Sequence, residues 1–222
     1  MSVLSVAIDG PASSGKGTVA RLVAHALGYG YVDTGSMYRA VAWDALQRDT
    51  DLGDEAALSQ LATQLDYHCR WDGNELRIEV SGTDVTQELR EQSVGQAASQ
   101  VAVLPGVRAA LLVRQRELGA QGGVVMDGRD IGTVVLPDAD LKIFLDASID
   151  ERARRRHAEL QVRGLVVPYQ TVRREIEARD TQDMERTTAP LRLAPDAVHV
   201  DTTFLSARDA AEHIVALARA RS

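Results

Sequence analysis

The stretch that most constrains the fold of this chain is an apolar segment that runs into a glycine-bounded loop and then into a helix. Residues 3–8 have the apolar character of a buried strand, and helical spacing of apolar residues resumes at Val19. The loop between them reads Asp9-Gly10-Pro11-Ala12-Ser13-Ser14-Gly15-Lys16-Gly17-Thr18. Its glycines and lysine have the spacing of a P-loop, and the strand and helix stand where that motif requires them. The sequence therefore predicts a phosphate-binding loop rather than a chance turn rich in glycine and serine.

Each part of this loop has a physical role in binding phosphate. Gly10 and Gly15 let the backbone bend round an anion, so that successive N–H groups point into the bend and the helix N-terminus adds partial positive charge. Lys16 can reach the outer phosphates as a point charge. One position departs from the motif, because Gly17 stands where Ser or Thr would offer a hydroxyl to magnesium, and Thr18 follows one residue later. We therefore expect the metal to be held less directly than in other P-loops.

Composition limits the classes of protein to which the chain can belong. With 222 residues and 45% hydrophobic content it can bury a full core, as one domain with insertions. The net charge of -7 argues against non-specific nucleic-acid binding, and Cys69, the only cysteine, leaves no internal disulfide. No apolar run is long enough for a membrane span, and no basic leader precedes the first strand. We expect a soluble cytoplasmic monomer without nucleic-acid or membrane partners.

An arginine follows the next expected strand in an unusual position. Residues 31–32 read as a short strand, and Ser36 as the N-cap of a helix over 37–46. Tyr38 and Arg39 fall in the first turn of that helix, where the helix dipole favours acidic side chains. An anionic partner would explain Arg39 better than local stability does. The alternative is a solvated surface arginine.

The central part of the chain changes its hydrophobic period. Residues 54–65 have helical spacing, whereas 65–71 and 75–80 alternate around Asp72-Gly73-Asn74 as in a β-hairpin, and 83–85 read as a third strand. An antiparallel patch within an alternation of strands and helices indicates an inserted subdomain. Helices are expected next over 89–104 and 105–119. They carry Ser99 and Arg108, which could also be an exposed helix serine and an ordinary surface arginine.

A second strong signal comes at the carboxyl end of the next apolar strand, over 123–126. Asp127 follows it directly, and in P-loop proteins a carboxylate at the tip of a neighbouring parallel strand holds magnesium or its water shell. Arg129 and Asp130 emerge at the same end, where open α/β sheets bind ligands. Charges in a glycine-flanked turn at that edge favour a functional role. The alternative is that Arg129 and Asp130 form a simple ion pair.

The last third of the chain concentrates arginine. After a core strand over 140–145, Ser148 and Glu151 match a capping box, so that a helix begins there and carries Arg152 and Arg156 on one face. The usual interpretation of such a basic run is a solvated helix face. No acid interrupts the run from Arg152 to Arg156, however, and the helix would repel itself unless an anion lay beside it. We therefore expect something anionic beside this helix.

A Gly/Pro turn then leads into a second arginine-rich helix, expected over 169–179, and into the polar segment from Arg179 to Arg186. Two such helices joined by a turn are what a lid that closes over phosphates would need. A strand over 197–200 and a helix over 206–220 complete the expected elements.

With these features in place, the chain resembles the bacterial cytidylate kinases, members of the nucleoside-monophosphate kinase group, over essentially its whole length. The hairpin before Ser99 is similar to the enlarged monophosphate-binding region of that family, and Gly-Lys-Gly-Thr is the form of the loop common among monophosphate kinases. The motifs that carry the resemblance are Ile8-Asp9-Gly10-Pro11, Ser14-Gly15-Lys16-Gly17-Thr18, Asp33-Thr34-Gly35, Tyr38-Arg39, Ala98-Ser99-Gln100-Val101, the segment 127–135, Lys142-Ile143-Phe144-Leu145, Arg179-Asp180 through Asp183 to Arg186, and Ala189-Pro190-Leu191.

The resemblance implies an α/β fold within one cytidylate kinase domain over residues 1–222. The expected parts are a P-loop kinase core with a parallel sheet flanked by helices, an inserted monophosphate-binding subdomain with a small antiparallel sheet, and a helical lid. Their segments are 1–36, 99–150 and 187–222 for the core, 37–98 for the insert and 151–186 for the lid.

The resemblance also implies transfer of the γ-phosphate of MgATP to CMP and dCMP, in pyrimidine metabolism. The expected ATP site is Gly10, Pro11, Ala12, Ser13, Ser14, Gly15, Lys16, Gly17, Thr18, Arg152 and Arg156. In the expected acceptor site, Arg39 and Arg129 bind the phosphate, with Tyr38 nearby. The base is bound by Ser99, Arg108, Asp130 and Arg186, and Thr34 lines the same pocket. The ribose is bound by Asp183 and Arg179. The expected catalytic residues are Lys16, Arg129, Arg156 and Arg179, and the Mg²⁺ ligands are Asp127 through water and Thr18.

Two alternatives remain open from the residues themselves. A kinase for another small acceptor, such as UMP, AMP or a metabolite hydroxyl, would share the same donor loop. A nucleotide-dependent regulatory switch would also share it, but GTP-binding switches read guanine with Asn-Lys-x-Asp. Asn74 is the only asparagine and Glu75 follows it, so that motif is absent.

Overall fold

The structure, a computed structural model, describes residues 3–72, 75–120 and 122–221. The chain divides into two compact units, one formed by Met1–Asp33 with Leu118–Ser222 and the other by Thr34–Glu117. The second unit thus contains all of the predicted insert and also the segment that carries Ser99 and Arg108. The finer division into core, insert and lid stays a prediction.

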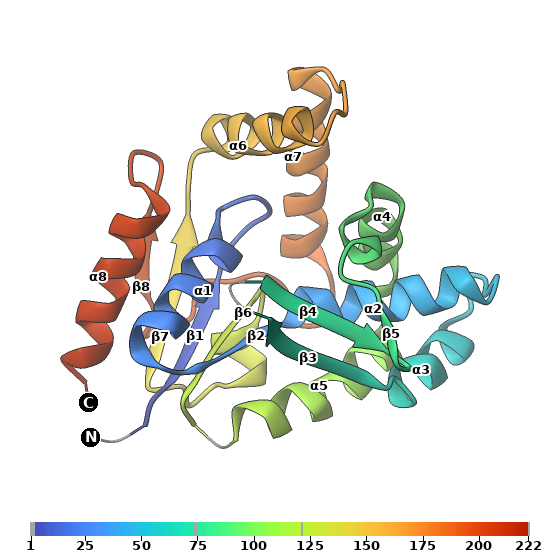
Figure 1. Ribbon diagram of the computed structural model, residues 1–222, viewed down its shortest axis with the longest axis horizontal. Helices are drawn as coiled ribbons and strands as arrows, with labels where there is room; N and C mark the ends of the chain where they lie inside the picture. The colour runs from blue at the N-terminus through green and yellow to red at the C-terminus, as the bar shows by residue number, and fades with distance from the viewer. Residues whose placement is uncertain (1–2, 73–74, 121, 222) are drawn as a thin grey trace. The chain divides into compact units, whose positions relative to one another are not determined.

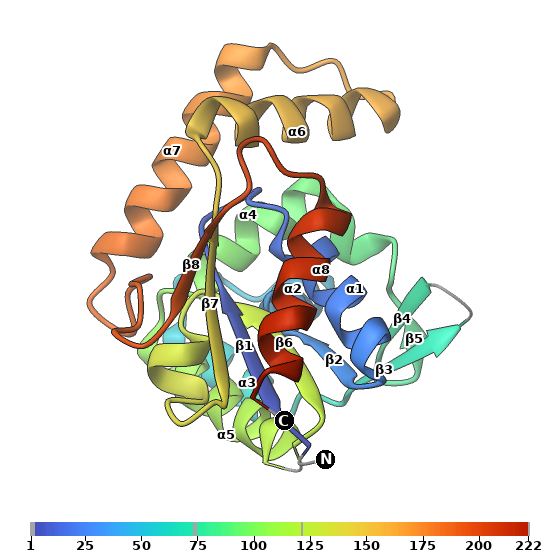
Figure 2. The ribbon, with the colours of Figure 1, turned by 90° about the vertical axis from the view of Figure 1, so that its left-hand side faces the viewer.

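The first unit is built on a five-stranded parallel sheet with the strand order β2-β6-β1-β7-β8. In Figure 1 and Figure 2, helices α1 and α8 lie side by side on one face of this sheet, and α6 and α7 follow at its carboxyl end. The predicted parallel sheet flanked by helices is confirmed. Its strands are β1 (Ser5–Asp9), β2 (Gly30–Asp33), β6 (Val124–Gly128), β7 (Leu141–Asp146) and β8 (Val198–Asp201), and its helices are α1 (Lys16–Leu27), the π-helical turn η2 (Ile131–Val135), α6 (Ile149–Val162), α7 (Tyr169–Glu185) and α8 (Ala207–Arg219).

The central strand β1 is buried on both faces, and its residues 6–8 are 0% exposed. A parallel strand that is buried on both faces requires such consecutive apolar residues. Pairing in register aligns the carboxyl ends of the strands, so that Asp33 of β2 stands opposite Asp127 of β6, and Asp9 of β1 opposite Gly128. The acids that end these strands therefore lie at one edge of the sheet, where the P-loop also begins.

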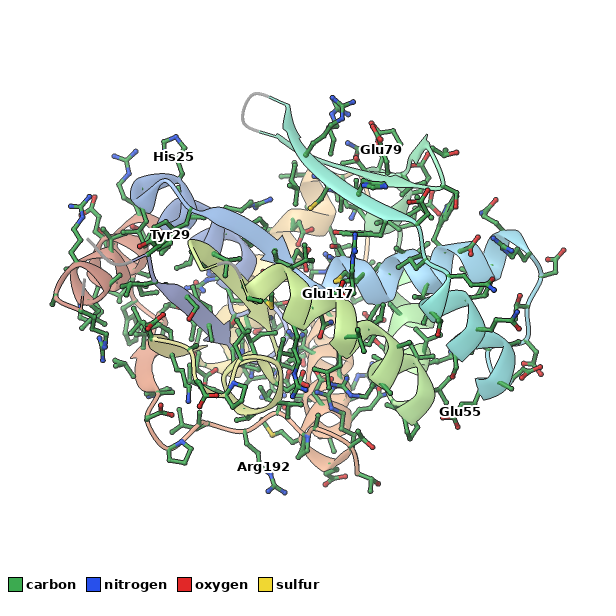
Figure 3. All side chains as sticks on the ribbon, turned by 90° about the horizontal axis from the view of Figure 1, so that it is seen from below. His25, Tyr29, Glu55, Glu79, Glu117 and Arg192 are labelled. Carbon is green, nitrogen blue, oxygen red and sulfur yellow. The ribbon has the colours of Figure 1, made fainter. Side chains whose placement is uncertain are left out.

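The second unit has its own apolar core and a three-stranded antiparallel sheet, β3-β4-β5. The pairing of β3 with β4 confirms the predicted hairpin, whose turn residues Gly73 and Asn74 lie outside the described residues. The start of α3 is tied to α5, because the Glu55 carboxylate labelled in Figure 3 accepts a hydrogen bond from the Gly106 N–H at 2.9 Å. The elements are α2 (Thr34–Gln47), α3 (Glu55–Thr63), β3 (Tyr67–Asp72), β4 (Glu75–Val80), β5 (Thr83–Asp84), the 3-10 turn η1 (Glu88–Arg90), α4 (Gln92–Val101) and α5 (Pro105–Gly119), which ends just past the unit boundary.

Within the described ranges, no single helix is both long and apolar enough to cross a membrane. Only α4 and α5, taken together as a pair bent by 100°, reach that threshold, and they do so by length and composition.

Three predicted helices differ from the structure. The helix expected over 89–104 is divided into η1 and α4, because the backbone of Glu91 is extended between them. Helix α2 begins at Thr34 directly after β2, so Ser36 is not an N-cap; it lies inside the helix, where its hydroxyl is hydrogen-bonded to the Tyr67 hydroxyl at 2.7 Å. Helix α7 continues to Glu185 instead of ending at Arg179, because no glycine or proline interrupts it. Asp183 therefore stands one helical turn beyond Arg179 rather than in a loop.

Candidate active site

The predicted P-loop joins β1 to α1, and its lysine is hydrogen-bonded to the loop backbone. Gly15 adopts the left-handed conformation (φ 88°) at the N-cap of α1, and a Cβ on Gly10 would collide with the carbonyl oxygen of Leu145. Lys16 is buried, and its Nζ donates a hydrogen bond to the Pro11 carbonyl oxygen at 3.1 Å. The buried Ser14 hydroxyl has no hydrogen-bond partner among the described residues. An orphaned donor at a helix N-terminus fits an anion that would satisfy it.

Lys16 lies in a buried environment in which other positive charges act on it. The pKa of Lys16 is lowered to about 7, first by burial and then by the positive charge of Arg129, while the negative charge of Asp127 opposes the change. Lys16 and Arg129 come from different elements of the first unit, the P-loop and the end of β6. Two cations held close together in a buried place predict a ligand with several negative charges.

Arg129 and Asp130 do not pair with one another; each pairs with a residue at the end of α7 or just after it. Arg129 Nε donates to Asp183 Oδ2 at 2.7 Å, and Arg186 Nη2 lies 3.3 Å from Asp130 Oδ1. A further ion pair of 3.7 Å joins Arg186 to Asp183. Burial opposes both shifts, but the contact between Arg129 and Asp183 raises the pKa of Arg129 and lowers that of Asp183. The alternative of a simple Arg129–Asp130 pair is therefore wrong, and four predicted site residues form one charged cluster.

Asp127 lies beside the P-loop helix and is held by a tyrosine. The Tyr31 hydroxyl donates a hydrogen bond to Asp127 Oδ1 at 2.7 Å, and burial together with the nearby Asp33 raises the pKa of Asp127 to about 6, against the effect of Lys16. Burial and the charge of Asp127 also raise the pKa of Tyr31, so the phenol stays protonated.

The acids at this edge fit magnesium held mainly through water. Asp33 and Asp127 stand opposite one another on paired strands, whereas the described residues contain no cluster of three or more His, Cys, Asp or Glu that could form a protein cage. Mg²⁺ typically takes one or two carboxylates, retains several waters and binds substrate phosphates. Thr18 is exposed, and its hydroxyl accepts a long 3.5 Å hydrogen bond from Arg21.

The P-loop is also bonded to both arginine-rich helices. Arg152 of α6 is buried; it pairs with Asp180 of α7 and donates to the Ala12 carbonyl oxygen at 3.1 Å. Asp180 accepts a hydrogen bond from the Ala12 N–H at 2.9 Å. Arg155 donates to the Ser14 carbonyl oxygen at 3.2 Å. Sequence reasoning missed Asp180 and Arg155 as residues that fix the loop, although the adjacent Arg179-Asp180 pair within a basic helix was the available signal.

The negative charge expected beside the Arg152–Arg156 run is supplied by the protein itself. The Glu151 carboxylate accepts hydrogen bonds from both Arg154 and Arg155, and Arg156 lies 2.9 Å from Glu159. These acids lie just outside the run but one helical turn away in space, so they neutralise it. Arg179 is exposed on α7, yet its charge acts on both Lys16 and Asp183.

The remaining predicted residues belong to the second unit. The Arg108 guanidinium lies over the Tyr38 ring, 5.5 Å from its centre, and donates to the Ala102 carbonyl oxygen at 3.1 Å. Arg108 is only 7% exposed, which excludes the interpretation as an ordinary surface arginine. Ser99 donates to the Gly95 carbonyl oxygen one turn earlier, and α2 carries the buried Thr34 and the partly buried Arg39.

Comparison with known proteins places these features in a family. The family model described as cytidylate kinase matches residues 6–220. The chain is 48% identical over 219 residues to a cytidylate kinase of Bacillus velezensis, covering 99% of this chain and 98% of that protein, and 49% identical to a cytidylate kinase of Magnetococcus marinus, covering 96% and 95%. Among solved structures, a gluconokinase from Sinorhizobium meliloti aligns over 98% of this chain and 93% of that one, with a TM-score of 0.50 and 15% identity. That last likeness bears on the fold alone.

Proposed function

The chain belongs to the cytidylate kinase family and is a phosphotransferase, and we propose that it transfers the γ-phosphate of MgATP to CMP or dCMP, giving CDP or dCDP and ADP. The observation that carries the proposal, beside family membership, is the convergence of Lys16 and Arg129 at the carboxyl ends of β1 and β6. Lys16 is suited to the phosphates of the donor ATP, and Arg129 to the phosphate of the acceptor CMP.

The donor half of the proposed site is the loop from Gly10 to Thr18. Its backbone N–H groups, the Ser14 hydroxyl and Lys16 would hold the ATP phosphates, and Lys16 would exchange its hydrogen bond with Pro11 for one with a phosphate oxygen. An anion there would also offset the burial and the repulsion from Arg129 that now lower the pKa of Lys16. Arg156 and Arg179 would add positive charge, whereas the buried Arg152 would act mainly through the loop backbone that it contacts.

The acceptor half is proposed from the residues that the family resemblance implies. Arg129 and Arg39 would bind the CMP phosphate, Asp130, Arg186, Ser99 and Arg108 the base beside Thr34 and Tyr38, and Asp183 and Arg179 the ribose. The attacking atom is an oxygen of the CMP phosphate, which is already ionised at neutral pH. The reaction therefore needs alignment and charge neutralisation rather than a strong general base.

Magnesium, when bound, would neutralise charge on the ATP phosphates. Asp127 and Asp33 would hold its water shell, with Thr18 as a further candidate. Exclusion of water from the site is the proposed role of α6 and α7 as a lid, since water would otherwise compete as acceptor. We further propose that the protein acts in the cytoplasm as a monomer, with nucleotides as its partners.

The test of this function is acceptor-dependent release of ADP from MgATP, with CMP, dCMP, UMP, AMP and GMP supplied in parallel at equal concentration. We expect CMP and dCMP to be clearly the best acceptors. Preference for UMP or AMP would instead favour the alternative of another small-acceptor kinase. Slow release that no acceptor accelerates would favour a nucleotide-dependent switch.

A further inference from the structure

The P-loop of this chain lacks a hydroxyl at position 17, and the structure shows what borders that position. A Cβ placed on Gly17 would lie 3.4 Å from the Tyr31 hydroxyl oxygen and 3.8 Å from Asp127 Oδ2. A serine hydroxyl would extend one covalent bond beyond that Cβ. The space that a serine or threonine side chain would use is therefore bordered by the Tyr31 hydroxyl and the Asp127 carboxylate.

Tyr31 reaches this place from a different strand. It lies on β2, is 6% exposed, and donates its phenolic proton to Asp127 Oδ1 at 2.7 Å. The strands β2 and β6 pair in register from Gly30 to Asp33, so the tyrosine is fixed by the sheet itself. A rigid aromatic side chain on a central sheet can present a hydroxyl with little loss of conformational entropy.

We propose that Tyr31 supplies the hydroxyl that this P-loop lacks at position 17. It acts as a positioning residue: it holds Asp127 through Oδ1, so that the other carboxylate oxygen, Oδ2, is oriented toward the water shell of the nucleotide-bound magnesium. The glycine at position 17 leaves room for the phenol, and the phenol in turn replaces the missing side chain. This proposal rests on the proposed function, because its ligand is a magnesium nucleotide.

A purely structural role for Tyr31 makes different predictions. A buried phenol needs a hydrogen-bond partner, and Asp127 would meet that need even if the contact had no bearing on metal binding. Loss of the hydroxyl would then lower stability and leave the effect of magnesium on nucleotide binding unchanged. The two roles are therefore separated by the dependence of nucleotide affinity on the metal rather than by stability or activity.

The experiment measures ADP binding by calorimetry with and without Mg²⁺, and Mn²⁺ binding to the protein–ADP complex by electron paramagnetic resonance. The variants are Tyr31→Phe, Gly17→Ser and the double variant. We expect Tyr31→Phe to leave metal-free ADP binding unchanged and to lower the affinity of the complex for the metal by about tenfold, as loss of an outer-shell partner typically does. The double variant should regain most of that affinity, because the serine hydroxyl enters the vacated space.

Tyr29→Phe is the matched control. Tyr29, labelled in Figure 3, accepts a hydrogen bond from the Leu4 N–H at 3.1 Å, so its variant also loses one hydroxyl of the first unit. It should change metal affinity by less than twofold. Gly17→Ser alone should give no gain, because the new side chain would meet the Tyr31 hydroxyl.

Unchanged metal dependence in Tyr31→Phe overturns the proposal, as does a loss that the double variant does not restore, or an equal loss of ADP affinity with and without metal. If Tyr31→Phe alone does not fold, a folded double variant with wild-type metal affinity supports the proposal, and one with weakened metal affinity overturns it. These measurements use no acceptor. Failure of CMP phosphorylation would therefore reject the proposed function while leaving a Tyr31-dependent metal effect standing.

Discussion

Asp180 of α7 accepts a hydrogen bond from the backbone N–H of Ala12 in the P-loop, with an N···O distance of 2.9 Å, while its second oxygen pairs with Arg152 of α6. The Ala12 side chain also packs in the apolar cluster between these helices. One carboxylate thus fixes the phosphate loop to both arginine-rich helices. Any closing motion of these helices must therefore either carry the loop with it or be confined to the parts beyond this junction.

Asp180→Asn should destabilise the protein through this junction. Asparagine can still accept the Ala12 hydrogen bond, but it removes the negative charge that compensates the buried Arg152 guanidinium. Loss of one member of a buried ion pair typically costs about 3 kcal/mol of unfolding free energy. Urea denaturation would measure this loss, and we expect ADP affinity to fall with it because Arg152, which donates to the Ala12 carbonyl oxygen, is no longer fixed by the ion pair.

Asp150→Asn is the control for that variant. Asp150 pairs with Arg173 between the same two helices, but its side chain is 71% exposed. Solvent-exposed pairs contribute no more than about 1 kcal/mol. If Asp180→Asn and Asp150→Asn had equal effects on stability, the junction would not be fixed by the buried pair.

The stability of the protein should depend on pH through Asp9. This buried carboxylate accepts hydrogen bonds from the Ile131 and Gly132 N–H groups at 2.7 and 2.8 Å, yet burial raises its pKa from 3.8 to about 6. The folded protein thus binds this proton more tightly than the unfolded chain does. The contribution of Asp9 is fully present below about pH 4 and decreases by about 3 kcal/mol as pH rises through about 6.

Urea denaturation of the wild type and Asp9→Asn between pH 4 and pH 7 isolates this effect. The stability of the wild type relative to the variant should fall across that range, because asparagine does not titrate. A difference between the two proteins that is constant with pH would show that Asp9 is not shifted upward.

Arg129→Ala and Arg39→Ala should each impair use of CMP far more than binding of ATP. Removing one charged partner of a phosphate costs roughly 2–5 kcal/mol, so we expect kcat/KM for CMP to fall by about thirtyfold or more. Steady-state kinetics with each nucleotide varied in turn would measure both effects. Wild-type CMP kinetics in either variant would remove that arginine from the acceptor site.

Lys16→Ala should lose transition-state stabilisation. Turnover is expected to fall by about two or more powers of ten, as for other preorganised charged groups, while the fold persists. Single-turnover measurements would separate this loss from weaker ATP binding. A near-normal rate of transfer would contradict the assignment of the donor loop.

Features that depend on short-range pattern could be predicted from the sequence. The P-loop is recognisable because its glycines and lysine follow a buried strand at fixed spacing, and the hairpin because apolar residues alternate on both sides of a turn. The five parallel strands follow from short apolar runs separated by helical segments. In each case the physical cause lies within some ten consecutive residues.

Features that depend on distant partners could not be predicted. The neutralisation of Arg152 comes from Asp180, 28 residues away, and the partner of Asp127 is Tyr31, 96 residues away. From the sequence, Tyr31 is recognisable only as a strand residue. The start of α2 was misplaced for a related reason, since Ser36 has the character of a cap but finds its partner, Tyr67, across the second unit.

The most direct test of the account follows the fate of a labelled phosphate. The protein is incubated with Mg²⁺, CMP and ATP that carries ³²P in the γ-position, and the products are separated by thin-layer chromatography. The account predicts that the label appears in CDP at the rate at which ADP forms, and that Lys16→Ala slows both by about two or more powers of ten. Label that appears only in inorganic phosphate, at a rate that CMP does not change, would contradict it.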